Sequence, residues 1–161
     1  MRSLLTRFRA VSVAAAIVAA PALAVTAAPV TAHASVSHKV PARLKALAYA
    51  KKQLGDPYRF GAAGPNAFDC SGLTMKAYGK AHKRIGGHSA TAQWRLAKKR
   101  HQLRSYKHVH RGDLLFYGRP GNVYHVAMYA GHGKIWHAPK PGDRVKLVPL
   151  WTTHVRYGRV R

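Results

Sequence analysis

The spacing of apolar residues changes once along this chain, and that change restricts the fold more than any other feature. From residue 41 to about residue 97, apolar side chains recur at three- and four-residue intervals, which predicts helices. From Leu114 onward they form short runs separated by Gly, Pro and Asn, which predicts strands. Helices followed by antiparallel strands indicate an α+β fold, with the N-terminal helices packed on an antiparallel sheet.

Three segments have the spacing of helices. The first is expected at 41–55, since proline is tolerated in a first turn and glycine commonly ends a helix. The second is expected at 70–80, and the third follows a cap at Ser89 or Thr91. The apolar face expected for the first helix consists of Leu44, Leu47, Ala48 and Leu54.

The second half of the chain predicts a meander of strands. A turn at residues 131–133 would join two of them as a hairpin. Alternation along the first strand of that hairpin would put His125 on the same face as Val123, Ala127 and Tyr129. The strands are expected at 114–117, 123–129, 134–137, 144–148 and 155–160.

The first 34 residues have the pattern of a secretory signal peptide. An arginine-containing start is followed by an uncharged run at 10–32 and a small-x-small motif at 32–34. A retained membrane anchor is the alternative, because the uncharged run is long enough to span a bilayer. We therefore expect a leader at 1–34, a short linker at 35–40 and one folded domain at 41–161.

Charge is strongly unbalanced. The chain has 28 Lys and Arg against 4 acidic residues, for a net charge of +24. Such an excess favours polyanionic partners. For an exported protein these would be anionic wall polymers, so a secreted, wall-associated location is expected and a specific nucleic-acid partner is not.

Cys70 is the only cysteine, so it cannot form a disulfide within this chain. It is an inert thiol, an intermolecular link or a nucleophile. Its place at the expected start of a helix would favour the thiolate, and the small residues Ser71 and Gly72 leave the sulfur accessible. A small cysteine that fills a gap in the core is the competing interpretation.

A cysteine nucleophile needs a base, and the chain offers 11 histidines. His125 and His137 stand out, because they lie on two strands that are expected to pair. One of them could accept the thiol proton while the other orients its ring. No paired-histidine zinc motif, second cysteine or glutamate is present, so neither a catalytic metal nor a cofactor is expected.

Several motifs occur together in the order of a known family. With them the chain resembles the NlpC/P60 family of cell-wall cysteine peptidases, over about residues 44–150. The resemblance implies a papain-like α+β core with a nucleophile at a helix N-terminus. The motifs are Gly55-Asp56-Pro57-Tyr58, Phe68-Asp69-Cys70-Ser71-Gly72-Leu73, Gln93, Gly112-Asp113-Leu114, His125-Val126-Ala127-Met128-Tyr129 and His137-Ala138.

The resemblance also implies roles for individual residues. Cys70 would be the nucleophile, His125 the general base and His137 the polar residue that orients it. Tyr58 would stabilise the oxyanion together with the Cys70 backbone N–H. The implied substrate-binding residues are Asp69, Ser71, Ser89 and Gln93.

The usual activity of the family is hydrolysis of the γ-D-glutamyl–diamino-acid bond in peptidoglycan stem peptides, and a monomer is expected. An amidase or acyltransferase with the same Cys-His pair is an alternative. Another is a non-catalytic basic protein that binds wall polymers or nucleic acid. The chain departs from the family pattern at Phe60, where tryptophan is common, and at Gly87-His88, where Pro-Arg is common.

Overall fold

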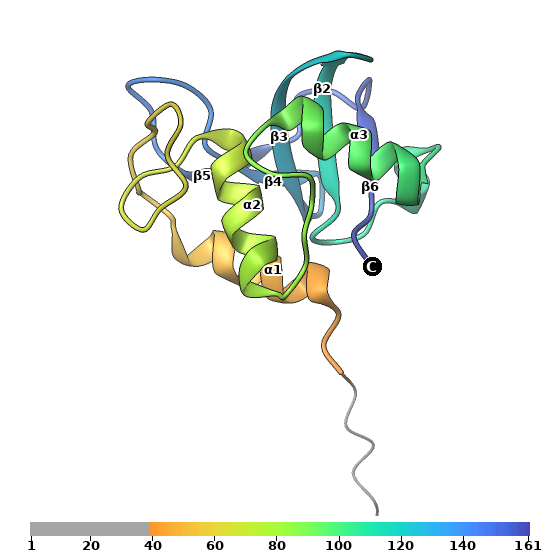
Figure 1. Ribbon diagram of the computed structural model, residues 1–161, viewed down its shortest axis with the longest axis horizontal. Helices are drawn as coiled ribbons and strands as arrows, with labels where there is room; N and C mark the ends of the chain where they lie inside the picture. The colour runs from red at the N-terminus through yellow and green to blue at the C-terminus, as the bar shows by residue number, and fades with distance from the viewer. Residues whose placement is uncertain (1–38) are drawn as a thin grey trace, which may run out of the picture. The chain divides into compact units, whose positions relative to one another are not determined.

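The computed structural model describes residues 39–161, which form three α-helices and a six-stranded sheet (Figure 1). The expected leader and most of the expected linker lie outside these residues. Within 39–161, no helix is long and apolar enough to cross a membrane. The helices are α1 (Ala42–Lys52), α2 (Cys70–Lys80), α3 (Ala90–His101) and a short 3-10 turn at Tyr106–His108.

The sheet has the strand order β1-β6-β2-β3-β4-β5, and every neighbouring pair is antiparallel. Strands β2 to β5 follow one another across the sheet, whereas the last strand returns to pair with β2. The predicted α+β layout is confirmed, and α2 and α3 both pack on β3. The strands are β1 (Gln102–Leu103), β2 (Leu114–Arg119), β3 (Asn122–Gly131), β4 (Lys134–His137), β5 (Lys146–Pro149) and β6 (Arg156–Gly158).

Apolar side chains cover both faces of the sheet. On the helix side, Leu73 and Tyr78 of α2 are fully buried with Phe116 and Met128 of the sheet. The Tyr78 hydroxyl donates a 2.6 Å hydrogen bond to the Gly112 carbonyl, so this buried polar group has a partner. A second, more aromatic cluster lies on the opposite face and includes Tyr117, Tyr129 and Tyr157.

The face expected for the first helix was wrong at two positions. Leu47 is buried as predicted, but Ala48 is exposed and Leu54 is 63% exposed. The helix ends at Lys52, so Leu54 lies beyond its last turn. Ala46 and Ala50 face the core instead, because their small side chains allow α1 to pack closely on α2.

A β-bulge changes the expected alternation along β3. Tyr117 pairs with His125 but the next residue, Gly118, pairs with Val123, so Tyr124 is the extra residue of the bulge. Val123 therefore packs on the helix side, whereas His125 shares the opposite face with Ala127. The prediction that Val123 and His125 lie on one face was wrong.

Candidate active site

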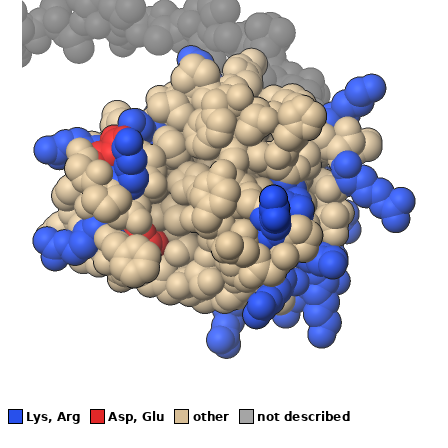
Figure 2. Space-filling view, turned by 90° about the horizontal axis from the view of Figure 1, so that it is seen from above, with Lys and Arg blue, Asp and Glu red and all other residues tan. Residues whose placement is uncertain are grey.

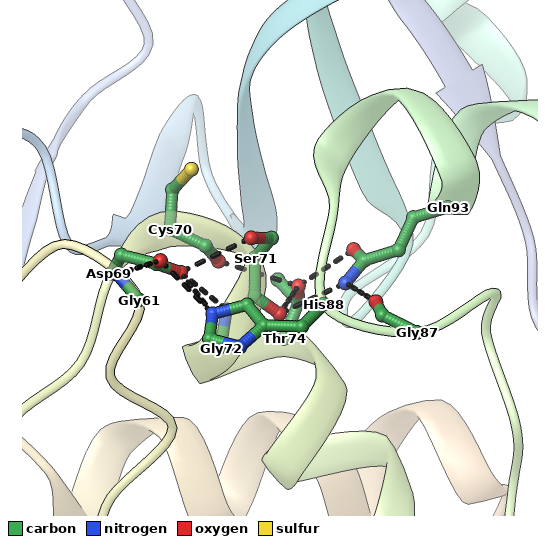
Figure 3. A network of polar contacts seen from close by, with 9 residues as sticks. All are labelled: Gly61, Asp69, Cys70, Ser71, Gly72, Thr74, Gly87, His88 and Gln93. Atoms are coloured by element: carbon green, nitrogen blue, oxygen red, sulfur yellow. Dashed lines mark hydrogen bonds and ion pairs between the residues drawn. The ribbon is translucent and has the colours of Figure 1, made fainter.

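Cys70 is the first residue of α2, as predicted, and it is half-buried. Asp69 caps this helix by accepting a 2.7 Å hydrogen bond from the Gly72 backbone N–H. In Figure 3 the Cys70 sulfur points away from the polar network around Asp69. Cys70 lines a hollow of about 350 Å³ with Tyr58 and Ser89, and Phe60 and Tyr124 contribute exposed rings to it.

The Asp69 carboxylate is the centre of a polar network (Figure 3). One oxygen accepts hydrogen bonds from Ser71 and Gly72, and the other accepts one from the Gly61 backbone N–H at 2.8 Å. His88 Nε2 lies 2.9 Å from both oxygens. Burial alone would raise the pKa of Asp69, but these hydrogen bonds outweigh it and hold the pKa below its ordinary value. Asp69 is therefore a carboxylate whose acceptor sites are already occupied.

Gly72 is the position where this network leaves no room for a side chain. An added Cβ would lie 2.1 Å from the Ala62 carbonyl oxygen and 2.9 Å from His88 Nε2. Distances this short require the backbone of the neighbouring loop to move. The glycine that follows Asp69-Cys70-Ser71 therefore allows the loop and His88 to pack directly on the start of α2.

Three of the four expected substrate-binding residues, Asp69, Ser71 and Gln93, are buried in the structure. Gln93 is only 1% exposed, and its amide nitrogen donates to the carbonyl oxygens of Ser71 and Gly87. Its amide oxygen accepts a 2.8 Å hydrogen bond from Thr74. Gln93 thus connects α3 to the start of α2, and Ser71 donates its hydroxyl proton to Asp69. Ser89 caps α3 and does line the hollow.

The two histidines singled out in the sequence lie together. His125 on β3 and His137 on β4 are buried, with His125 Nε2 3.1 Å from His137 Nδ1 and the rings nearly perpendicular at 76°. Burial, followed by the neighbouring His137, lowers the pKa of His125 to about 3. Burial, followed by the charge of Lys146, lowers the pKa of His137 to about 4. Both imidazoles are neutral at neutral pH.

Cys70 meets β3 beside this pair. The Val126 backbone N–H, next in the chain to His125, hydrogen-bonds the Cys70 sulfur and favours its charged form. Burial has the larger effect, however, and with the charge of Asp69 it raises the pKa of the thiol. The helix start was expected to favour a thiolate. In the structure burial outweighs it, so Cys70 is a neutral thiol that needs a base.

Tyr58 lies in the loop that leads to α2. Its backbone N–H donates a 2.8 Å hydrogen bond to the carbonyl of Asp143, which lies between β4 and β5. This bond holds the loop against that connection. Burial and the nearby charges of Cys70 and Asp69 raise the pKa of Tyr58, so its hydroxyl keeps its proton and can donate a hydrogen bond. The structure thus gathers Tyr58, Cys70 and Asp69 around one hollow.

Trp151 was not singled out in the sequence. It follows β5, stacks on Tyr117 with ring centroids 4.7 Å apart, and lies 5.4 Å from the His137 ring. The pattern contains no signal for this contact, because the chain after Pro149 has no regular period. Among residues 39–161, no group of three or more His, Cys, Asp or Glu is arranged to hold a metal ion.

Comparisons with known proteins agree with this geometry. The family model described as the NlpC/P60 family matches residues 55–158. A probable endopeptidase of Corynebacterium glutamicum is 41% identical over 90 residues, which cover 55% of this chain and 39% of the relative. A gamma-D-glutamyl-L-lysine dipeptidyl-peptidase of Bacillus cereus is 33% identical over 108 residues, covering 63% of this chain and 30% of the relative. The chain spans less than half the length of either relative.

A solved structure matches the fold. The crystal structure of the NlpC/p60 domain of the peptidoglycan hydrolase SagA has a TM-score of 0.64 and 34% sequence identity. The match covers 73% of this chain and 98% of that domain. The family model and the shared fold agree. The chain belongs to the NlpC/P60 family.

Proposed function

We propose that this protein is a secreted cysteine endopeptidase that cleaves peptidoglycan stem peptides at the γ-D-glutamyl–diamino-acid bond. One observation carries the proposal. A half-buried thiol at the start of α2 lies against the backbone of β3 at Val126, the residue that follows His125, and His125 Nε2 in turn lies 3.1 Å from His137 Nδ1. The relative from Bacillus cereus supports the bond, since its name describes a γ-D-glutamyl-L-lysine peptidase.

The arrangement of the two histidines supports a base at His125. If the His125 Nε2–H donates to His137 Nδ1, the Nδ1 lone pair of His125 is left to accept the Cys70 proton. Because the resting pair is uncharged, proton transfer accompanies attack by sulfur. His137 then holds the ring in the required tautomer, as the third member of a Cys-His-His triad.

The reaction is an acyl transfer in two stages. The sulfur bonds to the amide carbonyl carbon, and the oxyanion accepts hydrogen bonds from the Tyr58 hydroxyl and the Cys70 backbone N–H. Protonated His125 gives its proton to the leaving amine as the C–N bond breaks, which leaves a thioester. Water, deprotonated by His125, then releases the acid and restores the thiol.

The hollow beside Cys70 supports a peptide substrate with a free amine. Asp69 provides the negative charge at its base, although its oxygens already accept hydrogen bonds from the chain. We therefore infer that Asp69 attracts the ammonium group through its charge, whereas Ser89, whose hydroxyl caps α3, lines the hollow that would hold the peptide. The exposed rings of Phe60 and Tyr124 provide apolar walls.

Defined stem peptides test this proposal. Incubation of the protein with a γ-D-glutamyl-linked stem tetrapeptide should yield two dipeptides, identified by mass, and Cys70→Ala should yield none. Release of the intact stem peptide, with L-alanine at its N-terminus, from a glycan-linked stem would identify an amidase instead. Intact peptide after incubation with folded wild-type protein would overturn the proposed activity.

Export is tested separately. We infer that the leader at 1–34 directs secretion and is removed, and that the positive charge keeps the product on the wall. Sequencing the N-terminus of protein recovered from the wall fraction should place the cut near Ala34. Full-length protein recovered only inside cells would contradict this proposal.

A further inference from the structure

We propose that the surface beyond the C-terminal end of α2, at the opposite end of that helix from Cys70, binds a phosphodiester polymer of the cell wall. Three adjoining hollows of about 180, 480 and 500 Å³ lie there, and Arg159 and Arg161 line all three. We call them together the basic groove. The choice of a wall polymer rests on the proposed function, whereas the presence of the binding surface does not.

Segments far apart in sequence supply the charge of the basic groove. The start of α1, the loop after α2, the last turn of α3 and the C-terminal residues all contribute Lys or Arg. No Asp within residues 39–161 lines any of the three hollows. Among residues 39–161, no ion pair involves Arg84, Arg100 or Arg161. Arg159 is paired with Asp113, whereas the charges of Arg84, Arg100 and Arg161 are not neutralised within the described part of the protein.

Helix stability explains only part of this distribution. The last turn of α3 contains Lys98, Lys99, Arg100 and His101, where cations complement the negative end of the helix. Arg43 and Lys45 lie in the first turns of α1, where the same argument disfavours cations and favours acids. Positive charge therefore borders the groove at the N-terminus of α1 as well as at the C-terminus of α3. Because helix stability explains only the second of these, the distribution points to an external anion.

One residue of the groove is anchored to the core. Arg159 donates a 2.8 Å hydrogen bond to Asp113, whose side chain is fully buried, and another to the His108 carbonyl. This pair fixes the C-terminal residues against the end of the sheet. The neighbouring Arg161 is therefore held at the groove, although it is itself exposed.

The lining of the groove favours a polymer without bases. Proteins that bind single-stranded nucleic acid combine positive charge with aromatic rings on which bases stack. No Phe, Tyr or Trp of the described chain lines any of the three hollows. A chain of polyol phosphates presents phosphates at regular intervals and no bases, so it matches a groove lined by cations, histidines, glutamines and aliphatic side chains rather than by Phe, Tyr or Trp rings.

The groove lies away from the proposed site of cleavage. Cys70 begins α2, and His82 and Lys83, which line two of the hollows, follow its C-terminal end. An 11-residue helix is about 16 Å long, which separates the two regions. Figure 2, seen from above Figure 1, shows basic side chains at the left as well as at the right and lower right, and the visible acidic ones at the left. A polymer in the groove would leave the hollow at Cys70 open.

Two matched triple variants test the proposal in the inactive Cys70→Ala protein. The groove variant carries Arg84→Gln, Arg100→Gln and Arg161→Gln. The control variant removes the same charge at exposed positions outside the groove, with Lys52→Gln, Arg119→Gln and Lys134→Gln. Binding to fluorescent poly(glycerol phosphate) is measured by anisotropy over a range of salt concentrations. The groove variant should lose about tenfold or more in affinity, and the control variant less than about twofold. The slope of log affinity against log salt concentration should be smaller by roughly two in the groove variant, because fewer counterions are released on binding.

The outcomes separate this proposal from the proposed function. Equal losses in both variants would overturn a localised groove, and wild-type binding too weak to measure would overturn the interaction altogether. Binding of DNA with equal phosphate number as tightly as poly(glycerol phosphate) would overturn the choice of polymer. With Cys70 restored, the groove variant should cleave soluble stem peptides at the wild-type rate. Absent cleavage with intact polymer binding would reject the peptidase and leave the groove supported.

Discussion

Burial at Cys70 and His125 sets the protonation states from which the proposed reaction starts. It raises the pKa of the thiol and lowers that of His125 to about 3, so a neutral pair replaces the preformed thiolate expected from the helix start. The Val126 N–H and the helix amides then favour the thiolate that forms as the proton leaves. Catalysis in this site depends on position more than on a permanently charged nucleophile.

The pH dependence of peptide cleavage follows from these protonation states. An exposed histidine has a pKa of 6.5, whereas His125 stays neutral until the pH approaches about 3. We expect kcat/KM for a stem peptide to be largely retained at pH 5, where an exposed histidine would be mostly protonated. A rate profile measured from pH 4 to 9 checks this. A loss of activity centred near pH 6.5 would contradict the assignment of His125 as a buried neutral base.

His88 is expected to stabilise the loop and helix that surround Cys70, because it contacts both oxygens of Asp69 at 2.9 Å. His88→Ala should lower the free energy of unfolding by about 1–2 kcal/mol, since it leaves a buried carboxylate with fewer hydrogen bonds. His88→Arg, which keeps a hydrogen-bond donor to the carboxylate, should restore most of that loss. Urea titration of both variants tests this expectation, and equal destabilisation by Ala and Arg would argue against it.

At the scale of elements, the start of α2 is held by contacts that no local pattern contains. The helix itself was predictable from the spacing of Leu73, Ala77 and Tyr78, whereas its cap by Asp69 was found only in the structure. The partners of that cap come from the Gly61 loop and from His88, 19 residues further along the chain. The β-bulge at Tyr124 was likewise invisible to alternation, because it depends on how β3 pairs with β2.

Two glycines of α2 offer a matched comparison of packing. Gly72→Ala should destabilise the protein by about 2 kcal/mol or more, because its Cβ would lie 2.1 Å from a backbone oxygen. Gly79→Ala should stabilise it by about 0.5–1 kcal/mol, since nothing lies within 4 Å and alanine favours helix. Thermal denaturation of the two variants measures the difference. Similar melting temperatures would show that loop 61–62 does not pack on α2 as described.

The paired histidines on β3 and β4 should make stability fall in acid. In the folded protein the pKa is about 3 for His125 and about 4 for His137, whereas an exposed histidine has a pKa of 6.5. Between pH 6.5 and these lower values, the unfolded chain therefore binds more protons than the folded protein. Unfolding therefore becomes easier as the pH falls from about 6.5 toward 4. The melting temperature should drop across this range, and His125→Gln should make the drop smaller. An unchanged slope in that variant would show that other groups cause the acid sensitivity.

At the scale of the whole molecule, the sequence predicted the order of helices and strands and the pairing of His125 with His137. It also placed Cys70 at a helix start. Its positive charge predicted an anionic partner but not where that partner would bind, because Arg84, Arg100 and Arg161 meet only after folding. Gln93 was expected to contact substrate, but in the structure it is buried and bonds to Ser71. Its burial could not be predicted from the sequence, because it depends on how α3 packs on α2.

The central claim is that Cys70 forms a covalent bond with the peptide it cleaves. Its most direct test is the intact mass of the protein in acid-quenched samples taken during turnover of a γ-D-glutamyl stem tetrapeptide. We expect an added mass equal to the acyl half of the peptide, located at Cys70 and absent from Cys70→Ala. Cleavage by Cys70→Ala, or an adduct on another residue, would contradict the account.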